Sequence, residues 1–304
     1  MALTVVHHPG YTIDLPANHP FPMEKFRVLR QQLGEQTLAC PIEWLTPEPA
    51  PINTLARVHT RDYLNAFLQG RLERAAERRS GFTWSAALVE RVRLETGGTL
   101  LTLEAALATG LACNSAGGTH HAHADAASGY CLINDLAVAA AHALALGWVE
   151  RVLIVDCDVH QGDGTARLFV NVPGVFTFSM HAARNFPARK ATSDLDVALP
   201  NGMGDDAYLA ELASRLPGIL AAYQPDVVLY DAGVDVHQDD RLGYLALSNQ
   251  GLYARDHYVL SCCRNADIPV AAVIGGGYDR DIHALAGRHA QLHRAAADVL
   301  MTNA

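Results

Sequence analysis

Short runs of apolar residues recur along the second half of the chain, and each ends in a polar residue or a glycine. Four of them are rich in β-branched residues and predict strands at Arg151–Asp156, Gly174–Ser179, Asp226–Asp231 and Pro269–Ile274. Uninterrupted apolar runs of this length are typical of strands buried on both faces, as in a parallel sheet.

Other segments carry the spacing of helices. Leu88–Gly110 and Leu136–Leu146 are rich in alanine and leucine, and a helical repeat of apolar residues runs from Tyr208 to Ile219. Pro217 interrupts that repeat and predicts a kink or a break in the helix. The alternation predicts an α/β fold: a single domain over residues 1–304, with a mostly parallel central sheet and helices on both faces.

Composition narrows the class of protein. The 304 residues are 50% hydrophobic and 18% charged, which excludes an intrinsically disordered chain. A net charge of −9 argues against nucleic acid as the main partner and favours cationic partners. No apolar run approaches the ~20 residues of a membrane span. Because the six cysteines form no CxxC pair and the start resembles no signal peptide, we expect a cytoplasmic protein with reduced thiols and no membrane partner.

The richest polar segment follows directly on the first of the four predicted strands. Asp156, Asp158 and His160 are spaced by two, so in an extended chain their side chains share one face. Two carboxylates and an imidazole on one face are typical of a metal site; the alternative is a polar turn that uses Asp and Gly for the bend. Glycines on either side of Asp163 predict a tight turn that returns this residue to the site.

Tandem histidines form a second polar segment. His120 and His121 follow a glycine pair, and alone such a pair is more typical of a solvated loop. Beside an aspartate-rich metal motif they become candidates for general acid–base groups. Asp156 and Asp163 are available as the carboxylates that fix the imidazole tautomers.

Two more segments follow the last two predicted strands. Asp235 completes a set of one histidine and two carboxylates, and three protein ligands leave a position open for water, as in catalytic zinc sites. For Asp231 two interpretations are open: it lies behind these ligands, or it caps the following turn. Tyr278 ends a triple glycine that lets backbone approach a ligand closely. We predict that its hydroxyl donates to a developing oxyanion, although a tyrosine in this place is more often a packing residue.

The remaining histidines and cysteines are interpreted more simply. Histidines in helical segments are predicted to be surface or packing residues: His142, His257, His283, His289 and His293. Cys157 is predicted to be buried, since it alternates away from the metal face. We interpret Cys262 and Cys263 as packing residues, because no base lies near them in the sequence.

Taken together, these elements resemble the histone deacetylase superfamily, within the arginase/deacetylase fold. The resemblance is carried by the segments 117–121, 128–135, 156–164, 231–240 and 275–278, with flanking matches at 19–23, 58–64, 185–187 and 193–197. It covers nearly the whole chain and is closest to the bacterial class IV-like branch.

The resemblance implies metal ions as cofactors. The family's zinc ligands fall on Asp158, His160 and Asp235, and a carboxylate-rich site can also hold Fe²⁺ in the cell. The family's structural potassium site, built from backbone carbonyls, would involve Asp156, Asp158, His160, Ser179 and Met180.

The catalytic groups implied by the resemblance are two histidine–aspartate pairs and a tyrosine. His120 pairs with Asp156, His121 pairs with Asp163, and Tyr278 is the tyrosine that stabilises the transition state. We expect His121 to be the general base and then the acid, with His120 acting mainly by its electrostatic effect.

The resemblance also places a substrate tunnel at Gly129 and Tyr130, with Phe186 on the opposite wall. Many family members carry an acidic residue on a rim loop that clamps the backbone of a peptide. The corresponding stretch, Arg78–Trp84, has none. A small or flexible N-acylated amine is therefore expected to outperform a histone as substrate.

The function implied is that of a zinc-dependent amidohydrolase, which removes the acyl group from an N-acylated amine of the acyl-lysine or acylpolyamine type. One alternative is an arginase-like ureohydrolase with two manganese ions. Another is a non-catalytic protein that binds acyl amines.

Overall fold

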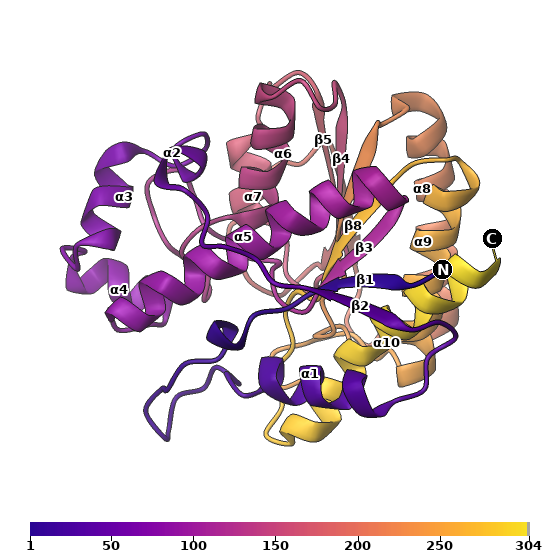
Figure 1. Cartoon of the computed structure of the whole chain (residues 1–304), viewed down its shortest axis with the longest axis horizontal. Coiled ribbons are helices and arrows are strands. Elements are labelled where there is room, and N and C mark those ends of the chain that lie inside the picture. The colour runs from indigo at the N-terminus through magenta and orange to yellow at the C-terminus, as the bar shows by residue number, and fades with distance from the viewer. Residues whose placement is uncertain (303–304) are drawn as a thin grey trace.

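The computed structural model describes residues 1–302 and is organised around one eight-stranded sheet (Figure 1). Its strands are β1 (Leu3–Val6), β2 (Ile42–Leu45), β3 (Leu111–Asn114), β4 (Val152–Asp156), β5 (Val175–Ala182), β6 (Leu195–Leu199), β7 (Val227–Asp231) and β8 (Val270–Val273). They are ordered β2-β1-β3-β8-β7-β4-β5-β6, and every neighbouring pair is parallel. The predicted parallel α/β architecture is confirmed.

Helices cover both faces of the sheet, and a short 3-10 helix spans Pro9–Tyr11. The α-helices are α1 (Lys25–Glu35), α2 (Ile52–Leu55), α3 (Arg61–Leu68), α4 (Arg74–Ser80), α5 (Ala86–Thr109), α6 (Asp135–Ala145), α7 (Asp163–Leu168), α8 (Asp205–Tyr223), α9 (Asn249–Asn265) and α10 (Ile282–Thr302). One group is centred on α5, which contacts α6, and the other is the series α1, α10, α9 and α8 (Figure 1). None of the helices within residues 1–302 has the length and apolar character needed to cross a membrane.

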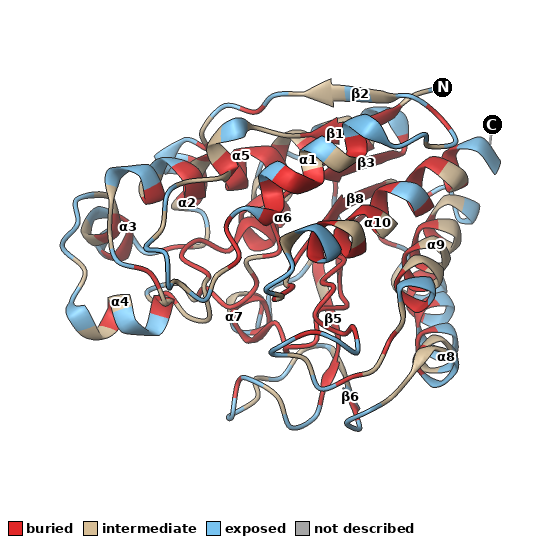
Figure 2. Cartoon of the chain, turned by 90° about the horizontal axis from the view of Figure 1, so that it is seen from below, coloured by how far each residue is buried: buried red, intermediate tan, exposed pale blue. Residues whose placement is uncertain are grey.

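The core lies between the sheet and these helices (Figure 2). Every residue of β3, β4, β7 and β8 is buried, as expected for central strands covered on both faces. The edge strands β2 and β6 are only partly buried. The inner strands are thus held rigidly, and the loops at their carboxyl ends leave from fixed points.

Four strands match the apolar runs closely, but the sequence did not predict β1, β2, β3 and β6. An acidic residue interrupts β2 and β6, and β3 begins directly after Gly110, the residue that caps α5, so none of these three stands out as a separate apolar run. The prediction of a break at Pro217 is wrong, because α8 continues through this residue. Pro217 is exposed, while Leu212, Leu216 and Ile219 on the other side of the helix are buried, and this packing keeps the helix continuous.

The predicted packing residues behave as ordinary side chains. Cys157 and Cys263 are buried, Cys262 is half-buried, and all six cysteines are free thiols. His289 and His293 are fully buried within α10, whereas His283 on the same helix is exposed. Amphipathic packing of α10 against α1 and α9 explains this difference.

Candidate metal and catalytic site

The carboxyl ends of β4 and β7 bring three possible metal ligands together. Because the two strands are parallel neighbours, with Asp156 opposite Asp231, the loops that follow them meet at one edge of the sheet. There, His160 Nδ1 lies 2.9 Å from Asp158 Oδ1 and 3.1 Å from Asp235 Oδ2. All three side chains are buried, and each offers an atom within 4.8 Å of the others.

This donor set fits a divalent cation. Asp235 Oδ2 is buried, and no described residue forms a hydrogen bond with it. Gly276 faces the same point, since a Cβ there would collide with the carboxylate oxygens of Asp158 and Asp235. Two buried carboxylates this close together repel one another unless a positive charge lies between them. One imidazole with two carboxylates therefore makes a candidate metal site.

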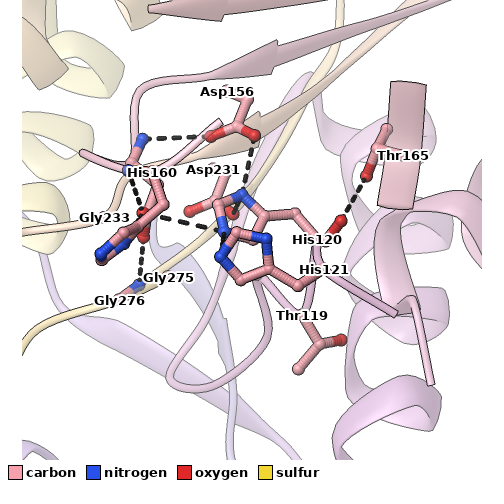
Figure 3. Close-up of polar contacts among 12 residues, drawn as sticks. Thr119, His120, His121, Asp156, His160, Thr165, Asp231, Gly233, Gly275 and Gly276 are labelled. Carbon is pink, nitrogen blue, oxygen red and sulfur yellow. Dashed lines mark hydrogen bonds and ion pairs between the residues drawn. The ribbon is translucent and has the colours of Figure 1, made fainter. Parts of the chain in front are cut away.

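The tandem histidines lie beside this donor set, and Figure 3 shows His120 against Asp156. Each histidine has its own carboxylate. His120 Nδ1 is 2.8 Å from Asp156 Oδ2, and His121 Nδ1 is 2.8 Å from Asp163 Oδ1. The two Nε2 atoms are 3.2 Å apart. In each ring Nδ1 forms a hydrogen bond with the carboxylate, so Nε2 is the nitrogen left to accept or donate a proton in a reaction.

Groups at the start of α6 fix the loop that carries these histidines. The Asn134 side chain caps α6 and also donates to the carbonyls of His120 and Ala122, at 3.2 and 3.3 Å. Asp135 accepts hydrogen bonds from the backbone and the hydroxyl of Thr119, at 2.7 and 2.6 Å. His59 lies 2.9 Å from the carbonyl of His123 and accepts from the Asn134 amide at 3.0 Å. The loop is therefore rigid although it has no regular secondary structure.

The two histidine–aspartate pairs differ electrostatically. Burial lowers the pKa of His121 to about 3, and the neighbouring His120 adds to this effect. Burial acts on His120 in the same direction, but the carboxylates of Asp156 and Asp158 outweigh it and raise its pKa well above the usual range. His121 is therefore favoured as a neutral imidazole and His120 as an imidazolium.

Asp231 lies behind His120 and does not cap a turn. Its Oδ2 is 3.9 Å from His120 Nδ1, and no described group donates a hydrogen bond to either carboxylate oxygen. The capping interpretation is wrong, because a cap would accept a backbone N–H. Burial and the neighbouring Asp156 raise its pKa well above the usual range. His120, Asp156 and Asp231 form a second group whose donor atoms lie within 4.8 Å of one another.

Tyr278 reaches the site from the loop after β8. Its backbone donates to Asp240 at 2.6 Å and accepts from Arg241 at 3.0 Å, so the loop is fixed on both sides of the ring. Its ring centroid is 6.5 Å from that of His160. Burial and the carboxylate of Asp235 raise the pKa of the phenol well above its usual range, which keeps the hydroxyl protonated and able to donate.

Two buried cations support the site, and the sequence analysis missed both. Lys25 in α1 donates to the carbonyl of Gly275 at 3.2 Å, and burial lowers its pKa to about 8. Arg255 in α9 donates to the carbonyls of Cys157 and Gly233, at 3.2 and 2.6 Å, and pairs with Asp256. Lys25 lies on the buried, mostly apolar face of α1. A lysine among apolar residues on one helix face is the sequence pattern that could have predicted its buried role.

A cavity of about 570 Å³ opens onto the site. His121, His160 and Tyr278 lie at its inner end, and Gly129, Tyr130 and Phe186 also line it, so the three residues predicted for a substrate tunnel face one cavity. Gly129 has a φ of +51°, and a Cβ there would lie 2.6 Å from the His121 ring and 3.3 Å from Phe186. Only a glycine lets the chain pass between these two rings.

The potassium site stays a prediction. Asp156 and Ser179 are opposite one another in β4 and β5, and all five residues expected there are buried: Asp156, Asp158, His160, Ser179 and Met180.

Comparison with known proteins agrees with this geometry. An uncharacterised protein from Picosynechococcus sp. is 52% identical over 98% of this chain and 100% of its own length. Histone deacetylase 2 of Arabidopsis thaliana is 29% identical over 91% of this chain and 74% of its own. A crystal structure described as an HDAC homolog complexed with SAHA has a TM-score of 0.81 at 24% identity, over 97% of this chain and 84% of that one, and so shares the fold. The family described as the histone deacetylase domain matches residues 19–293, and the chain therefore belongs to the histone deacetylase family of hydrolases.

Proposed function

We propose that the protein is a zinc-dependent amidohydrolase that cleaves the amide bond of an N-acylated alkyl amine. The observation that carries the proposal is the convergence of two histidine–aspartate pairs, a three-ligand metal set and a protonated tyrosine at the inner end of one apolar cavity. An unactivated amide needs all of these groups, because both the nucleophile and the leaving group are poor.

Asp158, His160 and Asp235 would hold the zinc ion. When bound, the ion polarises the amide carbonyl and lowers the pKa of an attacking water from 15.7 towards about 7. The side chains of the protein do the rest. Tyr278 donates a hydrogen bond from its hydroxyl to the oxyanion that develops from the carbonyl oxygen, and Lys25 holds the Tyr278 loop through the Gly275 carbonyl.

His121 is the group that moves the proton. It lines the cavity beside Gly129 and Phe186, on the path of the departing amine, whereas His120 lies deeper, with its Nε2 3.7 Å from Asp158. His121 takes the proton of water as the new C–O bond forms, and gives it to the amine nitrogen as the C–N bond breaks. His120 stays in place and stabilises the negative charge that develops beside it.

Two other functions fit less well. A binuclear ureohydrolase would need a second ion, and the group of His120, Asp156 and Asp231 is the place for it. There, however, Asp156 already occupies His120 Nδ1 at 2.8 Å, so a second ion would have to break that pair. A non-catalytic binder would tolerate the loss of a catalytic side chain, and the complete set argues against it.

The test is release of acetate from N-acetylated alkyl amines and acetyl-lysine peptides. Chelator-treated protein is reloaded separately with Zn²⁺, Fe²⁺ and Mn²⁺, and bound metal is counted by elemental analysis. One zinc ion per chain together with turnover supports the proposal. Two manganese ions with urea release from a guanidine substrate would contradict it.

Matched variants place the chemistry at His121. His121→Ala is expected to lose at least about 10²-fold in kcat, as for loss of a general base. His142→Ala removes an imidazole from α6 that is outside the cavity, and is expected to keep activity. Equal losses in the two variants would show that His121 is not the base.

A further inference from the structure

The mouth of the cavity carries a cluster of positive charge. Of the residues that line the cavity, three are arginines, Arg78, Arg79 and Arg241, and none is Asp, Glu or Lys. All three arginines are exposed. The cluster is unexpected on a chain with a net charge of −9.

No carboxylate within residues 1–302 forms an ion pair with this cluster, which we call the arginine rim. Among residues 1–302, none of the three guanidinium groups takes part in an ion pair, although seven ion pairs involve other arginines. The nearest acidic residue in sequence to Arg241 is Asp240, which is buried and accepts hydrogen bonds from the amides of Tyr278, Leu242 and Gly243. Its carboxylate is turned inward, towards the loop that carries Tyr278. The arginine rim therefore presents uncompensated charge to whatever enters.

The arginine rim is fixed to the tunnel through its backbone. The carbonyl of Arg79 accepts a hydrogen bond from the Gly129 amide at 3.1 Å, and the amide of Arg241 donates to the Tyr278 carbonyl at 3.0 Å. The two arginines are thus tied to the tunnel wall and to the catalytic loop, respectively. Their side chains remain free to reach a ligand, while their distance from the reaction centre is set by the fold.

The orientation of the substrate follows from the position of the catalytic groups. The amide carbonyl has to lie at the inner end, beside His160 and Tyr278, and the chain of the amine then runs out past Gly129 and Phe186. Its far end emerges at the arginine rim, beside Leu242 and Tyr244, which are 41% and 47% exposed. The arginine rim therefore contacts the end of the amine that does not react.

Resting on the function proposed above, we propose that the arginine rim selects N-acylated amines whose far end carries a carboxylate. A guanidinium group binds a carboxylate through two parallel hydrogen bonds, and three unpaired guanidinium groups at one mouth suit such an anion. An acylpolyamine carries a cation at the same place and is disfavoured. The net charge of −9 favours cations only at long range, whereas contact with the arginine rim decides the bound complex.

The experiment compares three acetylated amines with the same chain length and different ends. These are 6-acetamidohexanoate (anionic), N-hexylacetamide (neutral) and N-acetylcadaverine (cationic). At low ionic strength we expect kcat/KM to fall in that order, with at least a tenfold difference between the first and the last. Equal values, or a preference for N-acetylcadaverine, would overturn the proposal while leaving the amidohydrolase function intact.

Variants assign the preference to the arginine rim. In the double variant Arg79→Gln/Arg241→Gln, the ratio of kcat/KM between the anionic and cationic substrates should fall to about one, and Glu at both positions should reverse it. Arg74→Gln removes an exposed arginine from the same helix, α4, that does not line the cavity, and should leave the ratio unchanged. A ratio that survives in the double variant, or that Arg74→Gln also abolishes, would show that the arginine rim does not select the substrate. Thermal unfolding of each variant checks that the fold is retained.

A binding measurement separates this proposal from the function on which it rests. Hydroxamates with the same three ends are titrated into the metal-loaded protein by calorimetry. If none of the acetylated amines releases acetate, the proposed function fails, and the order of the hydroxamate affinities still decides the selectivity. Tighter binding of the carboxylate by tenfold or more supports the arginine rim, and any other order contradicts it.

Discussion

The inner end of the cavity and its mouth differ in charge and in burial. At the inner end, the side chains are buried carboxylates and imidazoles, each within 4 Å of a partner, as between His160 and Asp158 or Asp235. At the mouth, Arg78, Arg79 and Arg241 are exposed, and none is paired.

This difference separates two tasks. The buried groups face one another in a medium of low dielectric, where a misplaced charge costs several kcal/mol, so they are suited to holding an ion and moving a proton. The exposed groups interact through water and salt, where each pair is worth about 1 kcal/mol or less, so they bias selection without determining the chemistry. Mutations at the two ends of the cavity should therefore differ in kind as well as in size.

The largest effect is expected at the inner end. Asp235→Ala removes one of the two carboxylates of the candidate metal site, and should abolish both metal binding and turnover. Elemental analysis and acetate release measure the two losses. Circular dichroism should show that the fold is kept. A variant with full metal content would show that Asp235 is not a ligand.

Tyr278→Phe deletes one hydroxyl and keeps the ring in its packing with Tyr130 and Phe21. Loss of an oxyanion donor lowers kcat by about 10²–10³-fold, and we expect a change of that size with metal content unaffected. Tyr244→Phe, at the mouth, is the matched control and should change kcat little. If both variants keep their kcat, Tyr278 is a packing residue.

The support behind the loop of His120 and His121 should be sensitive to acid, because it includes the buried His59. Burial lowers the pKa of His59 to about 4 from 6.5. Between these values the unfolded chain binds the proton more readily, so stability is present above pH 6.5 and is lost as the pH falls towards 4. At about 1.4 kcal/mol per pKa unit, the loss is about 3 kcal/mol.

Urea denaturation at pH 7 and pH 5 measures this effect. His59→Gln should lose less unfolding free energy between the two pH values than the unmodified protein, even though it is less stable at pH 7. The exposed His283→Gln should behave like the unmodified protein. A pH dependence that is the same in all three proteins would exclude His59 as the source.

The smallest effect is expected from salt. Raising the ionic strength tenfold should lower kcat/KM for 6-acetamidohexanoate severalfold through KM, because the arginine rim is exposed and screened. The kcat value should stay unchanged at the higher ionic strength, because the catalytic groups are buried. A fall in kcat equal to that in kcat/KM would mean that salt reaches the inner end as well.

The residues that the sequence located best lie at the ends of strands. Asp156 and Asp231 end two apolar runs, and parallel pairing of those runs is enough to bring Asp158 and Asp235 together. A short-range pattern and one rule of sheet geometry are therefore enough to bring these predicted ligands together.

The residues that the sequence could not locate act across long separations in the chain. Lys25 supports a carbonyl 250 positions away, and Arg255 in α9 reaches the carbonyl of Cys157, 98 positions away. Their role depends on how α1 and α9 pack, which local periodicity does not encode. The arginine rim is similar, because Arg79 in α4 and Arg241 in the loop between β7 and α9 line one cavity only once the chain has folded.

The order of strands in the sheet also determines when the site can assemble during translation. Among residues 1–302, strands β2, β1 and β3 form one block and β7, β4, β5 and β6 another, and β8, residues 270–273, is the strand that joins them. The loop of His120 and His121 follows the first block, and the candidate metal ligands follow the second. A ribosome therefore has to release nearly the whole chain before the histidines can meet the candidate ligands, and a nascent chain that stops before residue 270 should keep the tandem histidines and the candidate metal ligands in two separate blocks.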